Sequence, residues 1–498
     1  MAEQQFWSSR TTFILAVVGS AVGLGNLWRF PYIAYANGGG AFLIPYLIAL
    51  LTAGIPLLIL EMGVGYKTRA GAPLAFRKLL GGRYDIAGWI AALIAFLIVT
   101  YYAVIIAWSV DYAFFSLDLA WGSDPGAFFY GSFLGLSEGV STFGTINTLI
   151  FAGAVVAWLW IYFSIFKGVR SVEKMVWITV VLPWLLIIVF VIRGVTLPGA
   201  MDGIAYYLTP DFGALLNIDV WIAAYGQIFY SLSLGMAIII AYSRFLGEEQ
   251  DVVKNGIIIA FANSFTSIFA GLAVFSTLGY LAHVNGVAVT EVVRSGIELV
   301  FVTYPAAISA LPVAPEFFGV LFFIMLVTLG IDSAFSLVEA TSAAIQDYLH
   351  KPEWLINGVI CVAAFVVGTF YMTSSGLYWL DIVDHYIMYF LLILVGLSET
   401  VFIGYVYGPP KLRAFVNQFS DWRIGRWWDY CIMLIVPGFL AIALLINVVD
   451  GITNPYGGYP GFANLVGWGI VITIPVLAVI ISFLVKEPPA GDEDVVSE

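Results

Sequence analysis

Residues 19–26 read Gly-Ser-Ala-Val-Gly-Leu-Gly-Asn and place three glycines, a serine and an asparagine inside an otherwise apolar stretch. Each glycine in a helix interior costs roughly 1 kcal/mol relative to alanine. A helix that breaks here would expose backbone carbonyls and free helix ends, which bind cations and charged ligands in membrane transporters. The chemistry that these residues predict is therefore coordination of ions and of a small charged ligand.

Two further groups of residues fit the same chemistry. Residues 224–236, Ala-Tyr-Gly-Gln-Ile-Phe-Tyr-Ser-Leu-Ser-Leu-Gly-Met, interrupt a later apolar segment in the same way. Asp332 directly follows the apolar run 325–331, and a carboxylate at the centre of a membrane costs about 2.5 to 3.5 kcal/mol on insertion scales. A bound cation would offset this cost. The alternative is a carboxylate that is hydrogen-bonded between helices for packing alone.

The composition of the chain indicates a membrane setting for these residues. Of the 498 residues, 61% are hydrophobic and 10% are charged, whereas soluble domains carry about 25% charged residues. Twelve apolar runs are long enough to span a bilayer. We expect an all-α membrane protein whose transmembrane helices lie at about 11–36, 41–67, 87–117, 147–166, 172–195, 219–245, 253–283, 317–348, 354–373, 380–406, 428–449 and 464–485.

Lysine and arginine follow the even-numbered spans, which places those loops and both termini in the cytoplasm by the positive-inside rule. Interrupted helices at matching places in two halves predict two inverted repeats. The location expected is the plasma (inner) membrane, which the chain crosses many times. The predicted parts are a cytoplasmic segment 1–10, a first repeat 11–195, a second repeat 219–406 with a structured external connection 284–316, two last helices within 428–485, and a disordered acidic tail 486–498.

Other classes of function fit the sequence less well. Cys361 and Cys431 fall in apolar segments and the three histidines lie far apart, so neither a disulfide framework nor a metal centre is expected. No pairing of nucleophile and base marks an enzyme. A channel would need a polar stripe along several spans, but the polar residues cluster at one depth. A transporter-like amino-acid sensor stays open. Glu61 and Glu399 are interpreted as structural hydrogen-bond acceptors.

Three segments, 19–31, 37–42 and 220–235, resemble the signatures of the neurotransmitter:sodium symporter family and occur in the family's order. The resemblance extends from Trp7 to the last span. It implies a LeuT-like fold with twelve transmembrane helices, 5+5 inverted repeats and broken helices 1 and 6. It also implies a prokaryotic sodium-coupled amino acid transporter that works by alternating access, as a monomer or homodimer in the lipid bilayer, with no nucleic-acid partner.

The resemblance implies two sodium sites. The first would be formed by Ala21, Asn26, Ser231 and Asn263, completed by the carboxylate of the substrate. The second would be formed by Gly19, Val22, Leu329, Asp332 and Ser333. For the two asparagines, hydrogen bonding between helices is the alternative interpretation.

Ser267 predicts a bound chloride ion. Chloride-independent bacterial members of the family have a carboxylate at this position, and animal relatives that require chloride have serine. Chloride would then replace the missing fixed charge, with coupling to a proton, or no anion at all, as the alternatives. Four neutral donors would bind it, namely Tyr46, Gln227, Ser231 and Ser267.

Gly23 predicts an amino acid as the substrate. Monoamine carriers of the family have an aspartate at this position, whereas a glycine leaves room for a substrate carboxylate, which would meet the amides of Gly23 and Gly25 and the hydroxyl of Tyr102. The other substrate-binding residues that the resemblance implies are Ser20, Ala21, Ile98, Tyr230, Ser231, Ser233, Met236, Ser333, Ser336 and Leu337. None of them is charged, so the expected substrate is neutral, with a small or medium apolar side chain.

Two gates complete the resemblance. Arg29 and Asp384 match the outer ion-pair gate of the family, with Tyr102 and Tyr230 as an aromatic lid beneath it.

At the inner gate, Trp7 and Asp347 match the family, but Gln4 stands where a basic residue is usual and Phe245 replaces a tyrosine. Either Arg10 becomes the partner of Asp347, or the inner gate is looser than in the family.

Overall fold

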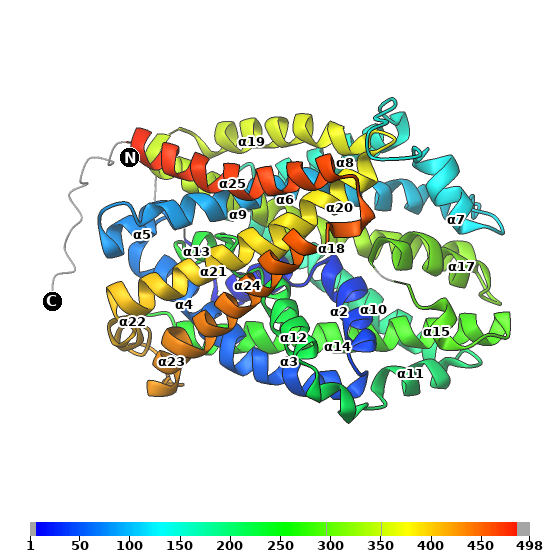
Figure 1. Cartoon of the computed structure of the whole chain (residues 1–498), viewed down its shortest axis with the longest axis horizontal. Coiled ribbons are helices and arrows are strands. Elements are labelled where there is room, and N and C mark those ends of the chain that lie inside the picture. The colour runs from blue at the N-terminus through cyan, green and yellow to red at the C-terminus, as the bar shows by residue number, and fades with distance from the viewer. Residues whose placement is uncertain (1–5, 295, 350, 486–498) are drawn as a thin grey trace.

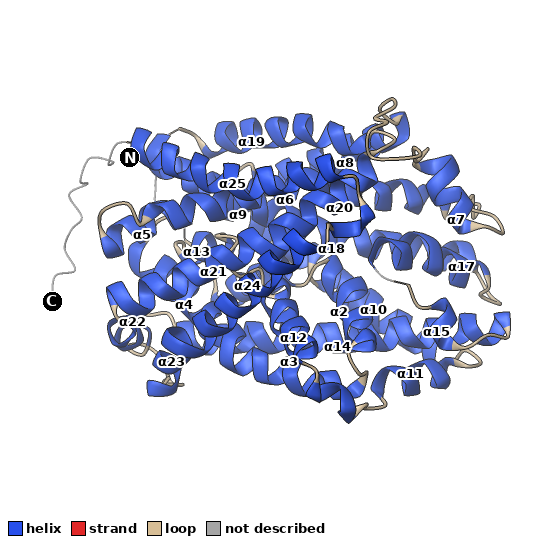
Figure 2. Ribbon diagram, viewed as in Figure 1, coloured by secondary structure: helices blue, strands red, loops and turns tan. Residues whose placement is uncertain are grey.

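A computed structural model describes residues 6–294, 296–349 and 351–485, and the regular elements of this part of the chain are helices (Figure 2). Most of the long helices run roughly along the longest axis of the molecule (Figure 1). Gln4 and the expected acidic tail 486–498 lie outside the described residues. The architecture is thus all-α, as the composition predicted.

The helices are bounded as follows. The first half of the chain forms α1 (Arg10–Ala21), α2 (Leu24–Ala36), α3 (Leu43–Ala49), α4 (Ile55–Thr68), α5 (Ala72–Leu80), α6 (Asp85–Phe115), α7 (Pro125–Ala127), α8 (Thr148–Ile165), α9 (Val169–Thr179), α10 (Val181–Val195) and α11 (Ala200–Leu208). The second half forms α12 (Ile218–Ser231), α13 (Ile238–Ser243), α14 (Val252–Asn285), α15 (Val289–Val292), α16 (Gly296–Glu298), α17 (Tyr304–Ser309), α18 (Pro315–Leu349), α19 (Glu353–Gly368), α20 (Gly376–Tyr386), α21 (Leu392–Val401), α22 (Pro409–Val416), α23 (Arg426–Tyr430), α24 (Val436–Thr453) and α25 (Gly461–Leu484).

Ten segments of the described chain are long and apolar enough to cross a membrane, and the bent pair α1 and α2 makes an eleventh. Each coincides with one of the apolar runs predicted from the sequence. The remaining run, 219–245, falls on α12 and α13, which have 14 and 6 residues. At 1.5 Å per residue neither can cross a hydrocarbon core of about 30 Å alone. This run is therefore an interrupted pair of helices.

Both predicted helix breaks are present. α1 and α2 meet at 53°, and between them Val22 and Gly23 leave the helical conformation, with ψ of 88° and −162°. Between α12 and α13, Ser233, Gly235 and Ala237 have positive φ values of 55°, 71° and 60°. Because this conformation costs a non-glycine residue roughly 1–2 kcal/mol, the tertiary contacts of Ser233 and Ala237, both buried, must hold the second break in shape.

α6 and α18 form the centre of the molecule. In the most apolar stretch of each helix, 83% of the residues of α6 and 78% of those of α18 are buried, compared with 22% for α25. α18 packs against α6, α1 and α13, so it contacts the helices next to both breaks. α25 crosses the face of the bundle that is nearest to the viewer in Figure 1. The apolar surface that α25 leaves exposed is typical of a helix in contact with lipid.

The described residues of the connection between α14 and α18 include helical segments, and its apolar composition predicted a structured connection. It contains α15, α16 and α17 and a π-helical turn, Leu299–Thr303. Phe301 stacks on Phe129 with ring centroids 5.4 Å apart, and Tyr304 stacks on Phe322 at 4.2 Å. These aromatic contacts hold the connection against the bundle, where α16 contributes to the cavity described next.

Candidate functional site

A cavity of about 580 Å³ joins the two helix breaks to one end of the bundle. Its deep part is lined by both breaks, α6 and α18, and its other end by α16, α20 and the loop before α25. Every substrate-binding residue predicted from the sequence except Ser336 lines this one cavity. The deep lining consists of Ser20, Ala21, Gly23, Gly25, Asn26, Ile98, Tyr102, Tyr230, Ser231, Ser233, Met236, Ser333 and Leu337.

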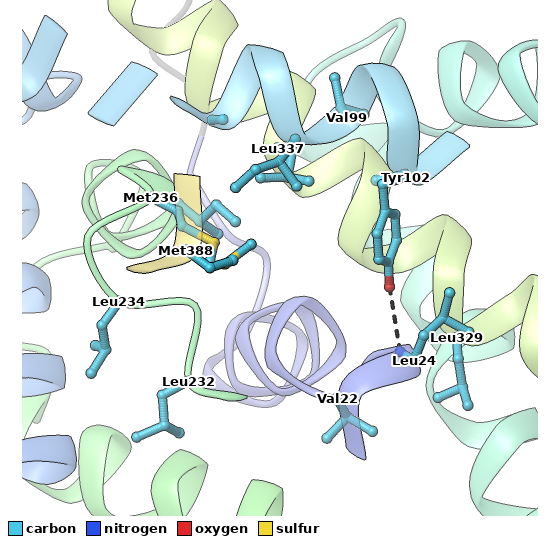
Figure 3. Close-up of a cluster of buried hydrophobic side chains, with 14 of the residues drawn as sticks. Val22, Leu24, Val99, Tyr102, Leu232, Leu234, Met236, Leu329, Leu337 and Met388 are labelled. Carbon is cyan, nitrogen blue, oxygen red and sulfur yellow. Dashed lines mark hydrogen bonds between the residues drawn. The ribbon is translucent and has the colours of Figure 1, made fainter. Parts of the chain in front are cut away.

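The first break directs the start of α2 toward the cavity. The Gly23 N–H donates to Asn26 Oδ1 at 2.9 Å. The Leu24 N–H donates to the Tyr102 hydroxyl at 3.3 Å, the hydrogen bond drawn in Figure 3. Gly25 belongs to the first turn of α2, where N–H groups have no acceptor within the helix and carry a partial positive charge. The Gly23 amide, predicted for the substrate, is engaged by Asn26, so the Gly25 amide and Tyr102 are better placed to meet an anion.

Neutral oxygens and amides of the predicted first sodium site form one buried cluster. The amides of Asn26 and Asn263 lie 2.8 Å apart, and the Asn263 amide is hydrogen-bonded to the Ser231 hydroxyl at 2.7 Å. The same amide lies 3.2 Å from the carbonyl oxygen of Ala21. The cluster contains the oxygen types that a sodium ion requires, together with the hydrogen bonds between helices that the alternative interpretation foresaw.

The predicted second sodium site centres on Asp332, which is fully buried. Oδ2 accepts a hydrogen bond from Thr179 at 2.5 Å, whereas Oδ1 has no hydrogen-bond partner within the described residues. Gly19 brings its backbone against this carboxyl group, because a Cβ there would lie 2.6 Å from Asp332 Cγ. Packing therefore accounts for Oδ2, the oxygen nearest to Gly19, and leaves Oδ1 without a partner among the described residues.

Thr179 and Ser264 are site residues that sequence reasoning missed. Thr179 is the single polar residue in the apolar run between Lys174 and Arg193, and that isolation was the signal that could have found it. Ser264 accepts a hydrogen bond from Tyr46 at 3.1 Å. It lies three residues before Ser267, so it is on the same face of α14.

The four residues predicted to bind chloride are all buried, and three of them, Tyr46, Ser231 and Ser267, belong to one hydrogen-bonded group around Asn26. Ser267 accepts from the Asn26 amide at 2.8 Å, and Tyr46 adjoins Ser267 as well as Ser264. Gln227 is completely buried, yet both polar atoms of its side chain lack a partner within the described residues. An orphaned amide costs about 1–3 kcal/mol. An anion that accepts from its N–H₂ group would remove part of that cost, so the residues present fit chloride.

The apolar end of the site is formed by Ile98, Met236 and Leu337, and Figure 3 shows Met236 and Leu337 near Met388. Met388 also lines the cavity, and sequence reasoning missed it. It lies in the π-helical turn Ile387–Leu391 that follows α20, not in either break. Ser336 takes a different place from the one predicted. Its hydroxyl is hydrogen-bonded to the Tyr242 hydroxyl at 2.7 Å and donates to the Asp332 backbone carbonyl at 2.8 Å.

Space beside the two glycines of the first break is restricted. A Cβ at Gly23 would lie 2.6 Å from Ser333 Oγ and 3.0 Å from the Tyr102 hydroxyl. A Cβ at Gly25 would lie 2.5 Å from the Tyr230 ring. Neither position can carry a side chain without displacing these groups, and this leaves backbone alone to face the ligand there.

The residues predicted as the outer gate lie between the deep cavity and its other end. The Arg29 guanidinium lies 4.5 Å from the centroid of the Tyr230 ring. Asp384 accepts from the Tyr101 hydroxyl at 2.7 Å, a partner that sequence reasoning missed. Both gate residues belong to the described chain and form no ion pair with each other there, which agrees with a cavity that continues past them.

The residues predicted as the inner gate lie at the opposite end and are in contact with α13 or the residues directly after it. The Trp7 indole N–H donates to the Tyr242 carbonyl at 2.9 Å, and the Trp7 backbone N–H donates to Phe245 at 3.0 Å. Asp347 forms an ion pair with Arg244 at 3.3 Å. This end of the cavity is therefore closed by packed aromatic and ionic contacts.

Arg244 is the partner that the structure shows for Asp347, and neither alternative foresaw it. Arg10 Nε instead donates to Asn255 Oδ1 at 2.6 Å. Arg244 also lies 4.4 Å from the centroid of Phe245 and 3.8 Å from Glu339. The sequence offered a signal, since Arg244 is the first basic residue after the second break.

Comparisons with known proteins agree with this arrangement. The family model for the sodium:neurotransmitter symporter family matches residues 4–125 and 122–487. An uncharacterized sodium-dependent transporter of Methanocaldococcus jannaschii is 40% identical over 97% of this chain and 98% of its own length. A human sodium- and chloride-dependent GABA transporter 2 is 33% identical over 95% and 85%, and a bovine sodium-dependent dopamine transporter is 33% identical over 94% and 73%. A broken-helix cavity and a family match along nearly the whole chain establish that the protein belongs to the sodium:neurotransmitter symporter family.

Proposed function

We propose that the protein is a symporter that imports a neutral amino acid with a small or medium apolar side chain, driven by sodium and dependent on chloride. Twelve transmembrane helices would form the LeuT-like fold with two inverted repeats of five helices, in the plasma membrane and with both termini in the cytoplasm. The observation that carries the proposal is the cavity that both helix breaks line. Behind this lining, Asp332 and Gln227 each keep a buried polar atom without a hydrogen-bond partner among the described residues.

Asp332 supports the sodium part of the proposal. The Asp332 carboxyl group lies beside Gly19, at the end of α1 where helix carbonyls are free of intrahelical donors. Its Oδ1 has no hydrogen-bond partner within the described residues. Carbonyl and carboxylate oxygens together are the hard ligands that a small cation prefers. The Asn26, Asn263 and Ser231 cluster supplies oxygens for a second sodium ion, which the substrate carboxylate would complete.

Chloride follows from the absence of charge around that first cluster. Asn26, Asn263, Ser231 and Ser267 are all neutral and buried. At an effective dielectric constant of about 20, an anion about 5 Å from a sodium ion contributes roughly 3 kcal/mol of attraction. The buried Gln227 amide and the Tyr46 hydroxyl are donors suited to it.

Gly23 supports an amino acid over a monoamine. The space that a Cβ would take is bounded by Ser333 and Tyr102, so an aspartate able to pair with an amine does not fit there. The start of α2 favours a carboxylate in its place. The apolar lining of Ile98, Met236 and Leu337 contributes no charge, which favours an uncharged substrate side chain.

The mechanism that fits this geometry is alternating access. The cavity continues past Arg29 and Asp384, while the Trp7, Arg244 and Asp347 contacts close the opposite end. In our proposal the first end faces outward. Sodium and the amino acid bind, the outer residues close over them, and the inner contacts break. The membrane potential then favours release inside by about 2.3 kcal/mol per charge per 100 mV.

Purified protein in liposomes tests the function. The liposomes receive an external mixture of the twenty amino acids with an inward sodium gradient, or with choline, and their contents are read by mass spectrometry. Accumulation of one or a few neutral amino acids with sodium alone would support the proposal. Equal accumulation with choline would refute the sodium coupling.

A transporter-like sensor is the alternative function. The sensor and the symporter differ in one expected result. For a sensor, sodium and an amino acid would raise the thermal stability of the purified protein, but no amino acid would accumulate in the liposomes.

A further inference from the structure

Two acidic side chains outside the cavity are completely buried in the bundle. Glu61 belongs to α4 and Glu399 to α21, and both have no exposed surface. The Gly235 N–H donates to Glu61 Oε1 at 2.8 Å. Glu61 Oε2 and both oxygens of Glu399 lack a hydrogen-bond partner within the described residues. The expectation that both side chains are structural acceptors therefore holds for Glu61 and fails for Glu399.

Glu399 lies within reach of the charge of Glu61, and neither residue forms an ion pair with a basic residue of the described chain. Glu61 also accepts a hydrogen bond from the Gly235 amide. The basic residues on neighbouring helices are engaged elsewhere in the described chain. Arg77 pairs with Asp85, Arg244 with Asp347, Lys254 with Asp421 and Arg413 with Asp429, while Lys67 lies over Phe415, Lys78 donates to the Thr68 carbonyl and Lys411 lies over Tyr407.

Glu61 and Glu399 cannot both be ionised in this buried environment. Burying one unpaired carboxylate is costly enough that the group neutralises instead, and a second like charge beside it adds repulsion. A proton bound to either group removes one charge and provides the donor that three orphaned oxygens lack.

We propose that Glu61 and Glu399 form a proton-binding site, occupied by at least one proton at neutral pH, that anchors the second helix break. The link to the break is direct, because Glu61 holds the Gly235 amide and Gly235 has φ of +71°. A Cβ at Gly235 would lie 3.2 Å from Phe229 and 3.4 Å from the Leu392 carbonyl of α21. Gly235 is thus enclosed between the helices that carry the two acids.

Loss of the proton would act on the substrate site through this anchor. With both groups ionised, repulsion drives Glu61 and Glu399 apart, and Glu61 can no longer hold Gly235 in place. Ser233 and Met236 flank Gly235 and line the cavity, so the deep site loses its shape. Release of one proton thereby converts a helix break that can bind substrate into one that cannot.

Infrared spectroscopy of the whole purified protein tests the site directly. The wild-type spectrum at neutral pH should contain a carboxylic-acid C=O band that Glu399→Gln and Glu61→Gln each shift or remove. Glu316→Gln is the matched control, because Glu316 is exposed and should leave the band unchanged. A carboxylic-acid region that neither buried substitution alters would overturn the proposal. Thermal stabilisation by sodium and amino acids verifies that each variant is folded.

Uptake provides a second readout, and it alone rests on the proposed function. Wild-type uptake should fall by about tenfold per pH unit once the shared proton is lost, as for a single titrating group. Glu399→Gln, which mimics the protonated acid, should remain flat over the same range, and Glu316→Gln should follow the wild type. Equal falls in Glu399→Gln and wild type would refute the proposal. If no variant transports anything, the proposed function fails while the infrared result still decides the proton site.

Discussion

Replacing Arg244 with glutamine should open the inner end of the cavity. The guanidinium is 7% exposed and interacts with Asp347 at 3.3 Å, Gln346 at 2.8 Å and Glu339 at 3.8 Å. Unit charges 3.3 Å apart attract by about 5 kcal/mol at an effective dielectric constant of about 20. Desolvation opposes this attraction, and we take about 2 kcal/mol as the net preference for the closed inner end. That difference is about 30-fold in population.

Labelling of a buried cysteine measures this population. Ser243 is fully buried and its hydroxyl has no hydrogen-bond partner within the described residues, so Ser243→Cys loses no bond. The background carries Cys361→Ala and Cys431→Ala, which removes the two native thiols. The rate of reaction with a membrane-impermeant maleimide applied to the inner face should rise about 30-fold in Arg244→Gln, because 2 kcal/mol corresponds to that factor.

Two further variants separate the ion pair from the bulk of the arginine. Arg244→Asp with Asp347→Arg restores an opposite-charge pair and should return the labelling rate toward that of the parent. Arg423→Gln removes an exposed arginine and should leave the rate unchanged. An Arg244→Gln protein that labels at the parent rate would refute the assignment of Arg244 to the inner gate.

Four other predictions follow from the site. Asp332→Asn should raise the sodium concentration needed for half-maximal uptake by at least about tenfold, since one lost ion contact of about 1.4 kcal/mol has that effect. The control is Asp111→Asn, because Asp111 carries a buried carboxyl group outside the cavity lining. This variant should leave the sodium concentration unchanged. Ser267→Glu should make uptake independent of chloride, which replacement of chloride by gluconate measures; continued dependence would contradict the charge argument. Gly23→Ala should abolish amino-acid binding in a thermal-shift assay, because its Cβ would lie 2.6 Å from Ser333 Oγ, whereas Gly226→Ala, where a Cβ meets open space, should not. Tyr101→Phe removes the hydrogen bond to Asp384 and should favour closure of the outer gate, so dissociation of bound amino acid should slow; a faster dissociation would count against it.

The spans and the breaks were predictable because both depend on local sequence. Hydrophobic runs determine which segments can cross a bilayer, whatever their neighbours. Glycine and polar residues inside such a run indicate interruption, and the breaks at Gly23 and Gly235 are present. The positive φ values of Ser233 and Ala237 were not predictable. Neither residue type prefers that conformation, and contacts from other helices hold it.

Partners from distant parts of the chain were the residues that sequence reasoning missed. Thr179 reaches Asp332 across 153 residues and Tyr101 reaches Asp384 across 283. Nothing local indicates such pairs, because they depend on how α9 and α6 are rotated against their neighbours. Arg244 differs from these cases. Its position directly after the second break can be read from the sequence, but the resemblance implies a basic residue in the N-terminal segment instead.

At each proposed gate, one arginine lies against an aromatic ring. Arg29 lies 4.5 Å from the Tyr230 centroid and Arg244 lies 4.4 Å from that of Phe245. The difference is in the carboxylate, because Asp384 is held by Tyr101 whereas Asp347 is held by Arg244.

Closing the outer end therefore exchanges a tyrosine hydrogen bond and a cation–π contact for an ion pair. A hydrogen bond to a charged group contributes about 1.5–3 kcal/mol and an exposed cation–π contact about 0.5–1 kcal/mol. An exposed ion pair returns only about 0.2–1 kcal/mol, so closure of the empty gate is unfavourable by about 1–4 kcal/mol. A deficit of this size lets the few kcal/mol of substrate and ion binding decide whether the gate closes, and this is the condition that coupled transport requires.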